Sequence, residues 1–431
     1  MDNSTYNNSK KDILIIGGGG REHAVGWKIS QSKRAGKLFF APGNAGTEEI
    51  GENTDIKATD IPSLLNFAIN KKIDITLALP DDPLALGIVD EFRKNGLRIF
   101  GPTKNSAKLE SSKAFAKNFM KKYSLPTANF EVFNDFDNAI GYVSDHSLPV
   151  VVKVSGLALG KGVFICKTKN EAITAIEEIM KKNSFGEAGK EIVIEEFLEG
   201  PEISIHVFSD GKNYSIFPSS GDHKRIGEED SGPNTGGMGT IVPHPLTNEI
   251  LLKKIEESII IPTLEGMKKE GSPFQGVLYP GLILTKNGPK ILEFNARFGD
   301  PETQSYMRLL ETDLLDIVES CIRETLNTIK IKWRQESACT IVLASKGYPA
   351  GYEKGKEING IVKAEDNTSV KVFHAGTKKE NEKIITNGGR VLGVSAVGRT
   401  LKEALDIAYE AINKISFEGM QYRKDIGKKY L

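Results

Sequence analysis

Short runs of apolar residues that end in glycine- or proline-rich turns fill the first part of the chain. Residues 12–17 have the pattern of a buried strand that ends at four consecutive glycines, and a helical pattern follows over residues 21–32. Further apolar runs that end at turns with proline occupy residues 38–41, 73–79 and 99–100. Strands that alternate with helices are typical of an open parallel sheet. The pattern therefore predicts an N-terminal α/β unit over about residues 1–108.

The pattern changes after this unit. One amphipathic helix is predicted over residues 105–123. Strands then come largely in hairpin-like pairs, at 150–154 with 163–166, 203–208 with 214–217, and 278–285 with 290–295, with a further strand at 192–197. Antiparallel pairs mixed with helices predict an α+β body. A last unit, about 335–431, combines short strands with an amphipathic helix over residues 400–415.

Composition and charge exclude several classes of protein. Lysine plus arginine and aspartate plus glutamate both number 57, so the formal net charge is zero and no nucleic-acid partner is predicted. Cys166, Cys321 and Cys339 lie far apart, which argues against a disulfide framework or a zinc site. The polar residues 1–11 do not resemble a signal peptide, and no apolar run reaches membrane-spanning length. We therefore expect a cytoplasmic protein, and the lack of an obvious apolar surface stripe favours a monomer.

The glycine run 17–20 follows a strand and opens a helix, as a dinucleotide-binding loop does. The G-x-G-x-x-G frames that start at Gly17 and Gly18 end on Glu22 and His23, so neither frame closes. The second predicted strand also lacks a terminal acidic residue for a ribose hydroxyl. A nicotinamide oxidoreductase is therefore not expected. A phosphate or carboxylate at the helix N-terminus is one hypothesis, and a plain tight turn is the alternative.

A second glycine-rich loop, residues 156–162, joins two predicted strands. It differs from a P-loop because three residues separate its first two glycines and Gly162 follows Lys161. We expect a lid over nucleotide phosphates, with a surface hairpin as the alternative. In the preceding strand, Lys153 interrupts a run of valines and needs an anionic partner. A triphosphate would supply one, and a buried ion pair is the competing explanation.

A later strand alternates cleanly. The pattern places Leu292 and Phe294 toward the core, and Glu293, Asn295 and Arg297 together on the other face. Next-but-one residues of a strand lie about 7 Å apart, so two oxygen-bearing side chains can share a hard cation. This predicts a magnesium (or manganese) site at Glu293 and Asn295, with Arg297 beside a phosphoryl group in transfer. A solvated strand face is the alternative.

Three further segments are polar and rich in turn residues. Asp300 suits a helix N-cap and Pro301 the first helical position, so a plain helix start and a substrate-orienting turn are both open. The loop 222–225, Asp-His-Lys-Arg, offers one acceptor and up to three donors. The loop 234–239 contains too many glycines for a core element. An ordinary polar loop is the alternative for both.

These segments together closely resemble the phosphoribosylamine–glycine ligase family of the ATP-grasp superfamily. The resemblance runs in order from about residue 12 to about residue 428. Its motifs are GGGGREHA (17–24), APGNAGT (41–47), GLALGKGV (156–163), EEFLEG (195–200), DHKRIG (222–227), GPNTGGMG (232–239), LEFNARFGDPETQ (292–304), KVFHAGT (371–377), TNGGRVLGV (386–394) and RKDIG (423–427). GPNTGGMG and NARFGDPETQ together favour this family over other ATP-grasp enzymes.

The resemblance implies a multidomain α/β and α+β architecture. An N-terminal substrate domain would span residues 1–108 as an open parallel α/β domain. The ATP-grasp body would span 109–130 and 197–334, with a lid over 131–196. A mixed α+β C-terminal domain would span 335–431.

The resemblance also implies roles for individual residues. ATP would lie between lid and body, held by Lys113, Lys153, Gly160, Lys161, Glu195, Glu196, Phe197, Leu198 and Glu202. Glycine and phosphoribosylamine would be surrounded by Gly19, Gly20, Pro80, Asp81, Asp222, His223, Lys224, Arg225, Asn234, Thr235, Gly236, Gly237 and Asp300. Two positions depart from the family pattern: Ser155 replaces an acidic residue, and Leu79-Pro80-Asp81-Asp82 replaces a Gly-Pro-Glu turn.

The implied activity is that of an ATP-dependent carbon–nitrogen ligase of purine biosynthesis. The γ-phosphate of ATP would move to the carboxylate of glycine, and the amine of phosphoribosylamine would displace phosphate from the resulting glycyl phosphate. Magnesium with Lys153, Lys161 and Arg297 would stabilise charge. The expected partners are these small molecules alone, without nucleic acid or membrane. Another ATP-grasp carboxylate–amine ligase and a protein that only binds nucleotide are the alternatives.

Overall fold

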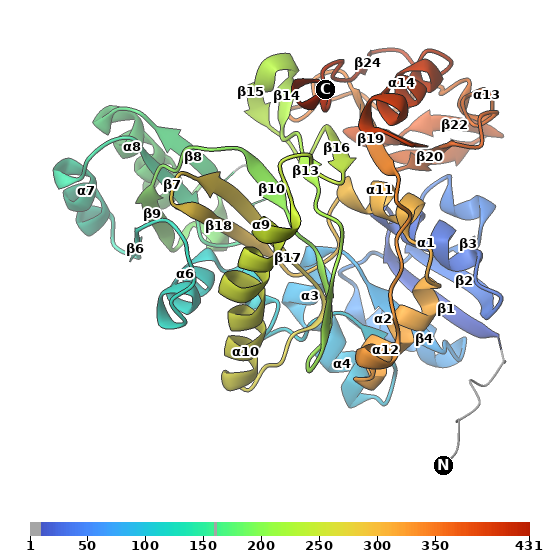
Figure 1. Ribbon diagram of the computed structural model, residues 1–431, viewed down its shortest axis with the longest axis horizontal. Coiled ribbons are helices and arrows are strands. Elements are labelled where there is room, and N and C mark those ends of the chain that lie inside the picture. The colour runs from blue at the N-terminus through green and yellow to red at the C-terminus, as the bar shows by residue number, and fades with distance from the viewer. Residues whose placement is uncertain (1–9, 159–161) are drawn as a thin grey trace.

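Five parallel strands form the N-terminal sheet in the computed structural model, which describes residues 10–158 and 162–431. The strands are β1 (Lys11–Gly17), β2 (Ala35–Pro42), β3 (Glu52–Asn53), β4 (Ile75–Ala78) and β5 (Ile99–Phe100), in the order β3-β2-β1-β4-β5. Its helices are α1 (Gly20–Ser30), α2 (Ile61–Asn70), α3 (Asp81–Leu86) and α4 (Ile88–Lys94). The open parallel sheet that the sequence predicts is confirmed (Figure 1).

The position of β1 inside the sheet explains why its sequence is apolar without alternation. Leu14 and Ile16 belong to the core on one face of the sheet, and Ile13 and Ile15 belong to the core on the other. All four side chains are fully buried. A strand covered on both faces needs apolar residues at every position, which is typical of parallel sheets.

The prediction of one continuous helix over residues 105–123 is wrong. The structure has two helices, α5 (Lys108–Ser111) and α6 (Lys113–Lys122). Ser112 separates them because its backbone is extended (φ −142°, ψ 105°), and its hydroxyl accepts a hydrogen bond from the N–H of Phe115. A serine that caps a new helix in this way competes with continuation of the previous one.

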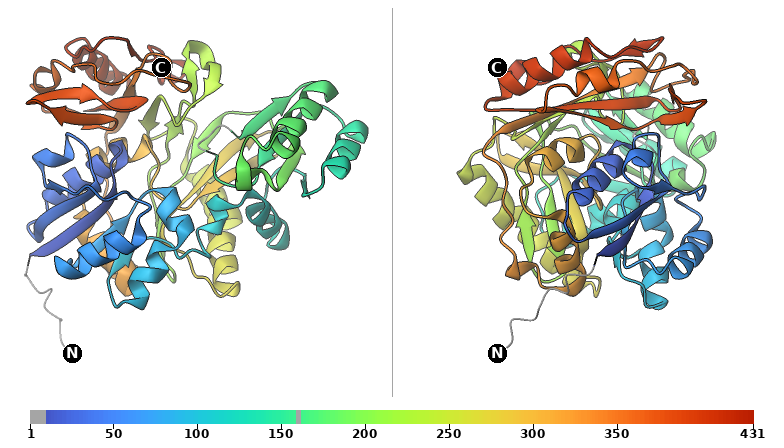
Figure 2. Two further views of the ribbon diagram at one scale, coloured as in Figure 1. Left: turned by 180° about the vertical axis from the view of Figure 1, so that it is seen from behind. Right: turned by 90° about the vertical axis from the view of Figure 1, so that its right-hand side faces the viewer.

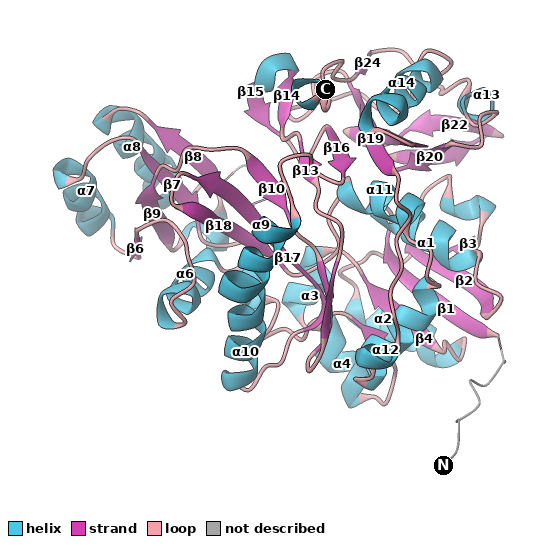
Figure 3. Cartoon of the chain, viewed as in Figure 1, coloured by secondary structure: helices cyan, strands magenta, loops and turns pink. Residues whose placement is uncertain are grey.

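A small antiparallel sheet forms a separate unit at the left of Figure 1. Its strands are β6 (Phe130–Phe133), β7 (Val150–Val154), β8 (Val163–Cys166) and β9 (Ile192–Glu196), in the order β6-β9-β7-β8. Helices α7 (Phe136–Asp145) and α8 (Lys169–Ile176) cover its outer face (Figure 3). The predicted pairing of the strands around the glycine loop is confirmed. Residues 159–161 of that loop, which include Gly160 and Lys161, lie outside the described residues.

The central sheet has the order β10-β17-β11-β12, with β18 paired to β17. Its strands are β10 (Glu202–Ser204), β11 (Val207–Asp210), β12 (Tyr214–Ile216), β17 (Gln275–Thr285) and β18 (Gly288–Asn295). The single strand predicted over 203–208 is wrong, because the ladder is interrupted between β10 and β11 opposite Pro280. Proline lacks the N–H that a continuous ladder requires. Helices α9 (Glu249–Ile255), α10 (Ile261–Lys269), α11 (Glu302–Leu309) and α12 (Leu314–Arg323) complete this part.

The last sheet joins residues from the body to residues from the C-terminal unit. Its order is β13-β16-β19-β23-β20, from β13 (Gly221–Asp222), β16 (Gly239–Val242), β19 (Ser337–Ser345), β23 (Arg390–Gly398) and β20 (Val370–His374), with β24 (Met420–Gln421) paired to β19. The remaining strands are β14 (Arg225–Gly227), β15 (Ser231–Asn234), β21 (Thr377–Glu380) and β22 (Lys383–Thr386). Helices α13 (Ile361–Ala364) and α14 (Leu401–Ile412) pack on this sheet, and the predicted C-terminal helix is confirmed.

The C-terminal unit lies over the N-terminal unit in both views of Figure 2. A buried contact joins them: the backbone N–H of His374 donates to Nδ1 of His23 at 2.9 Å, and the Asn44 amide donates to the carbonyl of His374 at 2.9 Å. Within residues 10–158 and 162–431, no helix is both long enough and apolar enough to span a membrane.

Replacing the Ser112 cap tests the break between α5 and α6. Ser112→Ala should lower the free energy of unfolding by about 1 kcal/mol, because the N–H of Phe115 loses its acceptor. Ser112→Gly is the matched control and should lose only a few tenths of a kcal/mol, since glycine is tolerated at N-caps. Chemical denaturation measures both, and equal loss in the two variants would contradict the capping role.

Candidate active site

A cleft of about 790 Å³ lies where the small sheet, the body and the two terminal units meet. The small sheet contributes Lys153, α6 contributes Lys113 and Lys117, and β18 contributes Glu293 and Asn295. The other predicted site residues along it are Asp81, Glu195, Glu196, Phe197, Leu198, Glu202, Asp222, His223, Lys224, Arg225, Asn234, Thr235, Gly236, Arg297 and Asp300. Residues that are far apart in sequence are thus gathered around one space.

A buried carboxylate pairs with two lysines at one end of the cleft. Glu195 forms ion pairs with Lys153 and Lys117, and the three side chains are at most 7% exposed. Lys153 also donates to the carbonyl of Leu292 at 3.2 Å, and Lys117 donates to Thr127 Oγ1 at 2.7 Å. Lys153 therefore has the buried ion-pair partner that was one of the two explanations for its position. Two cations share one anion, so a positive charge is left over.

Burial and the shared ion pairs together determine the pKa values of Glu195 and the lysines at this end of the cleft. Burial would raise the pKa of the Glu195 carboxyl, but Lys153 and Lys117 outweigh it and lower that pKa. Burial lowers the pKa of Lys117 to about 8, and it also lowers the pKa of Lys113. A further anion in the cleft would therefore stabilise the charged forms of these lysines.

Cations around the cleft strongly lower the pKa of the Glu293 carboxyl. Burial would raise its pKa, but Lys224, Lys113, Lys153 and other cations lower it to about 2. Lys224 Nζ lies 3.5 Å from Glu293 Oε1. Asn295 follows two residues later on the same strand. Glu293 is thus ionised at every pH at which the protein would work.

The alternation predicted for this strand is wrong at Leu292. The pairing shifts from Gly281 with Glu293 to Leu282 with Ile291, which leaves Leu292 as the extra residue of a β-bulge. Leu292 is only half-buried and lines the cleft, while Ile291 is fully buried in its place. The bulge still leaves Glu293 beside Lys153 at the cleft wall.

The oxygen ligands of this strand fit a hard cation. The described residues contain no group of three or more His, Cys, Asp or Glu side chains that could hold a metal ion. Magnesium does not need one, because it is commonly held by one or two carboxylates together with substrate phosphates. An ionised Glu293 next to the amide oxygen of Asn295 offers oxygen ligands only, which suits magnesium or manganese.

Arg297 is held by a carboxylate that the sequence interpretation missed. Its Nη2 lies 3.0 Å from Glu110 Oε1, and Glu110 Oε2 accepts from the N–H of Ala296 at 2.8 Å. Arg297 Nη2 also donates to Asn295 Oδ1 at 3.2 Å. Glu110 precedes α6 and belongs to no recognisable motif, so only the fold reveals it. The pair fixes the guanidinium next to Asn295.

The opposite end of the cleft gathers acidic groups and arginine. Asp222 Oδ1 is buried and has no hydrogen-bond partner among the described residues. Burial, together with the neighbouring Glu302, raises the pKa of Asp222 well above its usual value. Glu302 accepts from the Tyr279 hydroxyl at 2.7 Å. An acceptor that is buried and unpaired in this way is suited to a donor group on a bound molecule.

Asp300 does not cap α11 as predicted. The helix begins at Glu302 with Pro301 at the N-cap, and no side-chain hydrogen bond caps it. The Asp300 carboxylate instead accepts from Gln304 Nε2 at 2.8 Å and pairs with Arg390 at 3.2 Å. The arginine of the C-terminal unit draws this carboxylate away from the helix end.

The residues of the Asp-His-Lys-Arg segment (222–225) have different roles: Lys224 and Arg225 make charged contacts, whereas His223 holds backbone groups in place. Lys224 pairs with Glu202 at 3.0 Å, and Arg225 donates to the carbonyl of Gly232 at 2.7 Å. His223 uses both ring nitrogens on backbone groups: Nε2 accepts from the N–H of Gly427 at 3.0 Å, and Nδ1 contacts the carbonyl of Gly239 at 3.2 Å. Burial lowers the pKa of His223 to about 4. His223 is therefore a neutral side chain that secures its loop.

Of the predicted site residues that the structure describes, four are not among those that line the cleft: Gly19, Gly20, Pro80 and Gly237. The N–H of Gly19 donates to Glu22 Oε2 at 2.7 Å, so a carboxylate of the chain itself occupies this position at the start of α1. A Cβ on Gly20 would lie 2.5 Å from Gln304 Nε2. Gly20 therefore allows close approach of α1 to α11.

The cleft also contains residues that the sequence interpretation did not assign. Those with charged or tyrosine side chains are Arg21, Glu110, Lys117, Asp230, Tyr279, Glu302, Tyr348, Tyr352, Arg390, Lys429 and Tyr430. Arg390 lies within TNGGRVLGV, so a motif signal was available for it. Tyr348 accepts from the N–H of Gly236 at 3.0 Å, a contact between loops that no motif reveals.

The small four-stranded sheet, the antiparallel body and the lysine-lined cleft between them define an ATP-grasp protein. A biotin carboxylase from Campylobacter jejuni shares the fold, with a TM-score of 0.73 and 14% identity over 97% of this chain and 94% of that one. The solved structure of phosphoribosylamine–glycine ligase from Thermotoga maritima is more similar, with a TM-score of 0.83 and 38% identity over 96% of this chain and 100% of that one.

Sequence comparisons identify the family. Models of the phosphoribosylglycinamide synthetase N domain, ATP-grasp (A) domain and C domain match residues 11–110, 111–303 and 338–429. Phosphoribosylamine–glycine ligases from Caldanaerobacter subterraneus and Chlorobaculum tepidum are 49% and 45% identical to this chain, and each match covers 97% of this chain and 100% of the relative. The chain belongs to the phosphoribosylglycinamide synthetase family, and the predicted class, an ATP-dependent ligase, is confirmed.

Removing the shared carboxylate tests the charge balance at the lysine end. Glu195→Gln should lower the free energy of unfolding by about 3 kcal/mol or more, because two buried lysines lose their counter-charge. The double variant Glu195→Gln/Lys117→Met should recover part of that loss, since one excess charge is removed.

Glu187→Gln is the matched control, because Glu187 forms an exposed ion pair with Lys190 on the same unit. Urea denaturation of the four proteins measures the difference. A double variant less stable than Glu195→Gln would contradict the charge argument.

Proposed function

We propose that this chain couples glycine to 5-phosphoribosylamine at the expense of ATP and forms glycinamide ribonucleotide, ADP and phosphate through glycyl phosphate. The observation that carries the proposal is the division of one cleft into a cationic end and a mixed end. Lys113, Lys117 and Lys153 lie at the first, and Asp222, Lys224 and Arg390 are among the residues at the second. The similarity to phosphoribosylamine–glycine ligases over nearly the whole chain supports the choice of substrates.

The cationic end suits the triphosphate of ATP. Lys153 carries the charge left over from its pairing with Glu195, and Lys113 lies at the first position of α6, facing the same space. Positioned cations lower the barrier of phosphoryl transfer because they are in place before charge develops. A magnesium or manganese ion held by Glu293 and Asn295 would supply further neutralisation of phosphate oxygens.

The first chemical step transfers the γ-phosphoryl group. A carboxylate oxygen of glycine attacks the γ-phosphorus, the bond from that phosphorus to the β–γ bridging oxygen breaks, and ADP leaves. Arg297 lies beside Asn295 and is fixed by Glu110, so its guanidinium is positioned to stabilise the transferring group. The product is glycyl phosphate, a mixed anhydride that water would hydrolyse.

The second step forms the amide. The nitrogen of phosphoribosylamine attacks the carbonyl carbon of glycyl phosphate, the carbon–oxygen bond breaks, phosphate leaves and the nitrogen loses a proton. Asp222 Oδ1, which is buried and has no partner among the described residues, is suited to accept a hydrogen bond from a substrate amine. Lys224 and Arg225 supply positive charge for the phosphate of the ribosyl substrate.

A cytoplasmic location and a monomeric state stay predictions.

The test is ADP release by the intact protein with ATP, magnesium and glycine, with and without freshly generated phosphoribosylamine. The proposal expects release that needs both substrates and stops when the metal is chelated. Release with another amine in place of phosphoribosylamine would favour a different ATP-grasp carboxylate–amine ligase. ATP binding without any ADP release by folded protein would favour a binding protein.

Glu293→Ala should abolish turnover and leave the fold intact. The Glu293 side chain is about one-third exposed (36%), so its loss does not open a buried core, but it removes the ionised metal ligand. Glu199→Ala is the matched control, because Glu199 is exposed and does not line the cleft. Turnover and melting temperature are measured together. Normal turnover of Glu293→Ala would exclude the metal role, and loss of its melting transition would indicate a structural one.

Arg297→Ala should lower kcat by about 10² or more, as the loss of a preorganised donor does. Glu110 then loses its partner, but burial already raises the pKa of Glu110, so this carboxyl can take up a proton and the fold survives. Glu110→Gln is the control, because it keeps the arginine and loses only the charge that fixes it. Steady-state kinetics should place its kcat between wild type and Arg297→Ala, and an unchanged kcat in Arg297→Ala would remove Arg297 from the mechanism.

A further inference from the structure

Strands β14 and β15 form a hairpin, residues 225–234, that pairs with no other described strand. The hairpin stands apart from the sheets at the top of Figure 1. Its base continues into β13 and β16, which belong to the sheet of the C-terminal unit. Arg225 and Asn234, the paired residues at this base, both line the cleft. The position of the hairpin therefore affects the substrate end of the cleft, and something other than a sheet must fix it.

The turn of the hairpin has a conformation that its residues adopt only at a cost. Glu229 and Asp230 have φ values of +55° and +51°, in the left-handed region. Side chains with a Cβ are disfavoured there, by roughly 1 kcal/mol or more for each residue. Two such residues in succession persist when surrounding contacts determine the turn.

Those contacts come from the segment 423–427, which we call the clasp. The side chain of Arg423 is 2% exposed and binds the Asp425 carboxylate with two hydrogen bonds, of 2.8 and 2.7 Å. Its Nη1 reaches the hairpin, where it donates to Asp230 Oδ1 at 2.8 Å and to the carbonyl of Arg225 at 3.2 Å. Asp425 Oδ2 accepts from the N–H of Glu229 at 2.8 Å. The clasp thus binds both the turn and the base of the hairpin.

The clasp also secures the residues that enter the hairpin. The N–H of Gly427 donates to Nε2 of His223, and the ring of that histidine is buried. His223 is flanked by Asp222 and Lys224, both of which line the cleft. Lys429, two residues after the clasp, lies 3.4 Å from Asp230 Oδ2 and lines the cleft itself. The clasp and Lys429 therefore connect the C-terminal unit to the turn of the hairpin, to its base at Arg225 and to His223, which precedes it.

We propose that the clasp holds the hairpin in the shape that binds the amine substrate, and that Arg423 is a positioning residue for the reaction. This inference rests on the proposed function for the identity of that substrate. Residues 225–234 include none of the residues assigned to ATP, so we expect ATP binding not to depend on the clasp. A hairpin freed from the clasp has to be ordered when substrate binds, which weakens binding of the substrate but not of the nucleotide.

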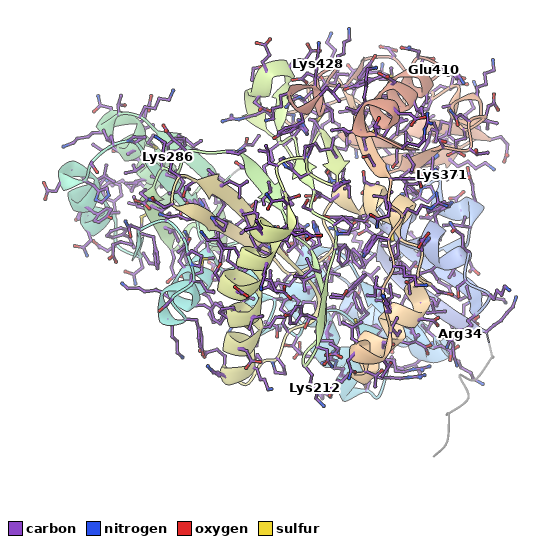
Figure 4. All side chains as sticks on the ribbon, in the orientation of Figure 1. Arg34, Lys212, Lys286, Lys371, Glu410 and Lys428 are labelled. Atoms are coloured by element: carbon purple, nitrogen blue, oxygen red, sulfur yellow. The ribbon has the colours of Figure 1, made fainter. Side chains whose placement is uncertain are left out.

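The variants are chosen to separate the ion pair from the fold. Asp230→Asn removes the charge that faces Arg423, and asparagine tolerates the left-handed turn. Arg423→Gln removes the whole contact, and Arg423→Lys keeps one ion pair. Arg34→Gln is the control, because Arg34 forms ion pairs with Asp316 and Glu319 away from the cleft. Figure 4 shows Arg34 on the opposite side of the molecule from Lys428, which follows the clasp.

Steady-state kinetics with phosphoribosylamine and binding of an ATP analogue measure the effect. Arg423→Gln should raise the KM for phosphoribosylamine about tenfold, the loss expected for a charge-assisted contact. Asp230→Asn and Arg423→Lys should raise it less, and the Asp230→Asn change should add nothing in an Arg423→Gln background. The Kd for the analogue should stay within about twofold of wild type in all variants. Unchanged KM in Arg423→Gln and Asp230→Asn, or a parallel rise of the analogue Kd, would overturn the proposal.

Amide hydrogen exchange over residues 225–234 gives a readout that needs no substrate. Exchange should be faster in Asp230→Asn and Arg423→Gln and unchanged in Arg34→Gln. A wild-type protein without ligase activity, combined with faster exchange in the variants, would refute the proposed substrate and keep the clasp. An active wild type whose variants exchange at the same rate would refute the clasp and keep the ligase.

Discussion

Two buried lysines that share a single carboxylate are the constraint on which the arrangement of the cleft depends. Lys117 and Lys153 are buried with one carboxylate between them, and Glu195 cannot neutralise both. Burying an uncompensated charge is costly, and a protein keeps it only where a ligand or a network offsets the cost. A bound triphosphate would offset it here. The small sheet and α6 are arranged so that Lys153, Lys113 and Lys117 face one space, together with Glu293 of β18.

The same constraint explains the carboxylates around the cleft. Glu110 forms an ion pair with Arg297, and Glu202 and Glu293 both form ion pairs with Lys224. Each anion holds a cation in one position before a substrate arrives, which is how a site achieves electrostatic preorganisation. The second end differs because Asp222 has an oxygen with no partner among the described residues. One end of the cleft is thus suited to an anionic ligand and the other to a ligand that also donates hydrogen bonds.

The sequence predicted the parts of the fold that depend on local pattern. The parallel N-terminal sheet, the strands on both sides of the glycine loop and the hairpin of β17 and β18 follow from apolar runs and turn residues. The errors lie where a non-local contact decides: Pro280 on one strand interrupts its neighbour, and Arg390 draws Asp300 away from the helix that it was expected to cap. Leu292 was misplaced because a β-bulge cannot be inferred from alternation. Glu110 and Tyr348 carry no motif, so only the fold brings them to the cleft.

Activation of glycine as its acyl phosphate is the central step of the proposed reaction, and an oxygen label tests it directly. Glycine labelled with ¹⁸O in its carboxylate is supplied with ATP, magnesium and phosphoribosylamine, and the released phosphate is analysed by mass. One labelled oxygen in each phosphate is predicted, because the oxygen that attacks the γ-phosphorus leaves with it. Unlabelled phosphate, formed alongside ADP and glycinamide ribonucleotide, would contradict the central claim.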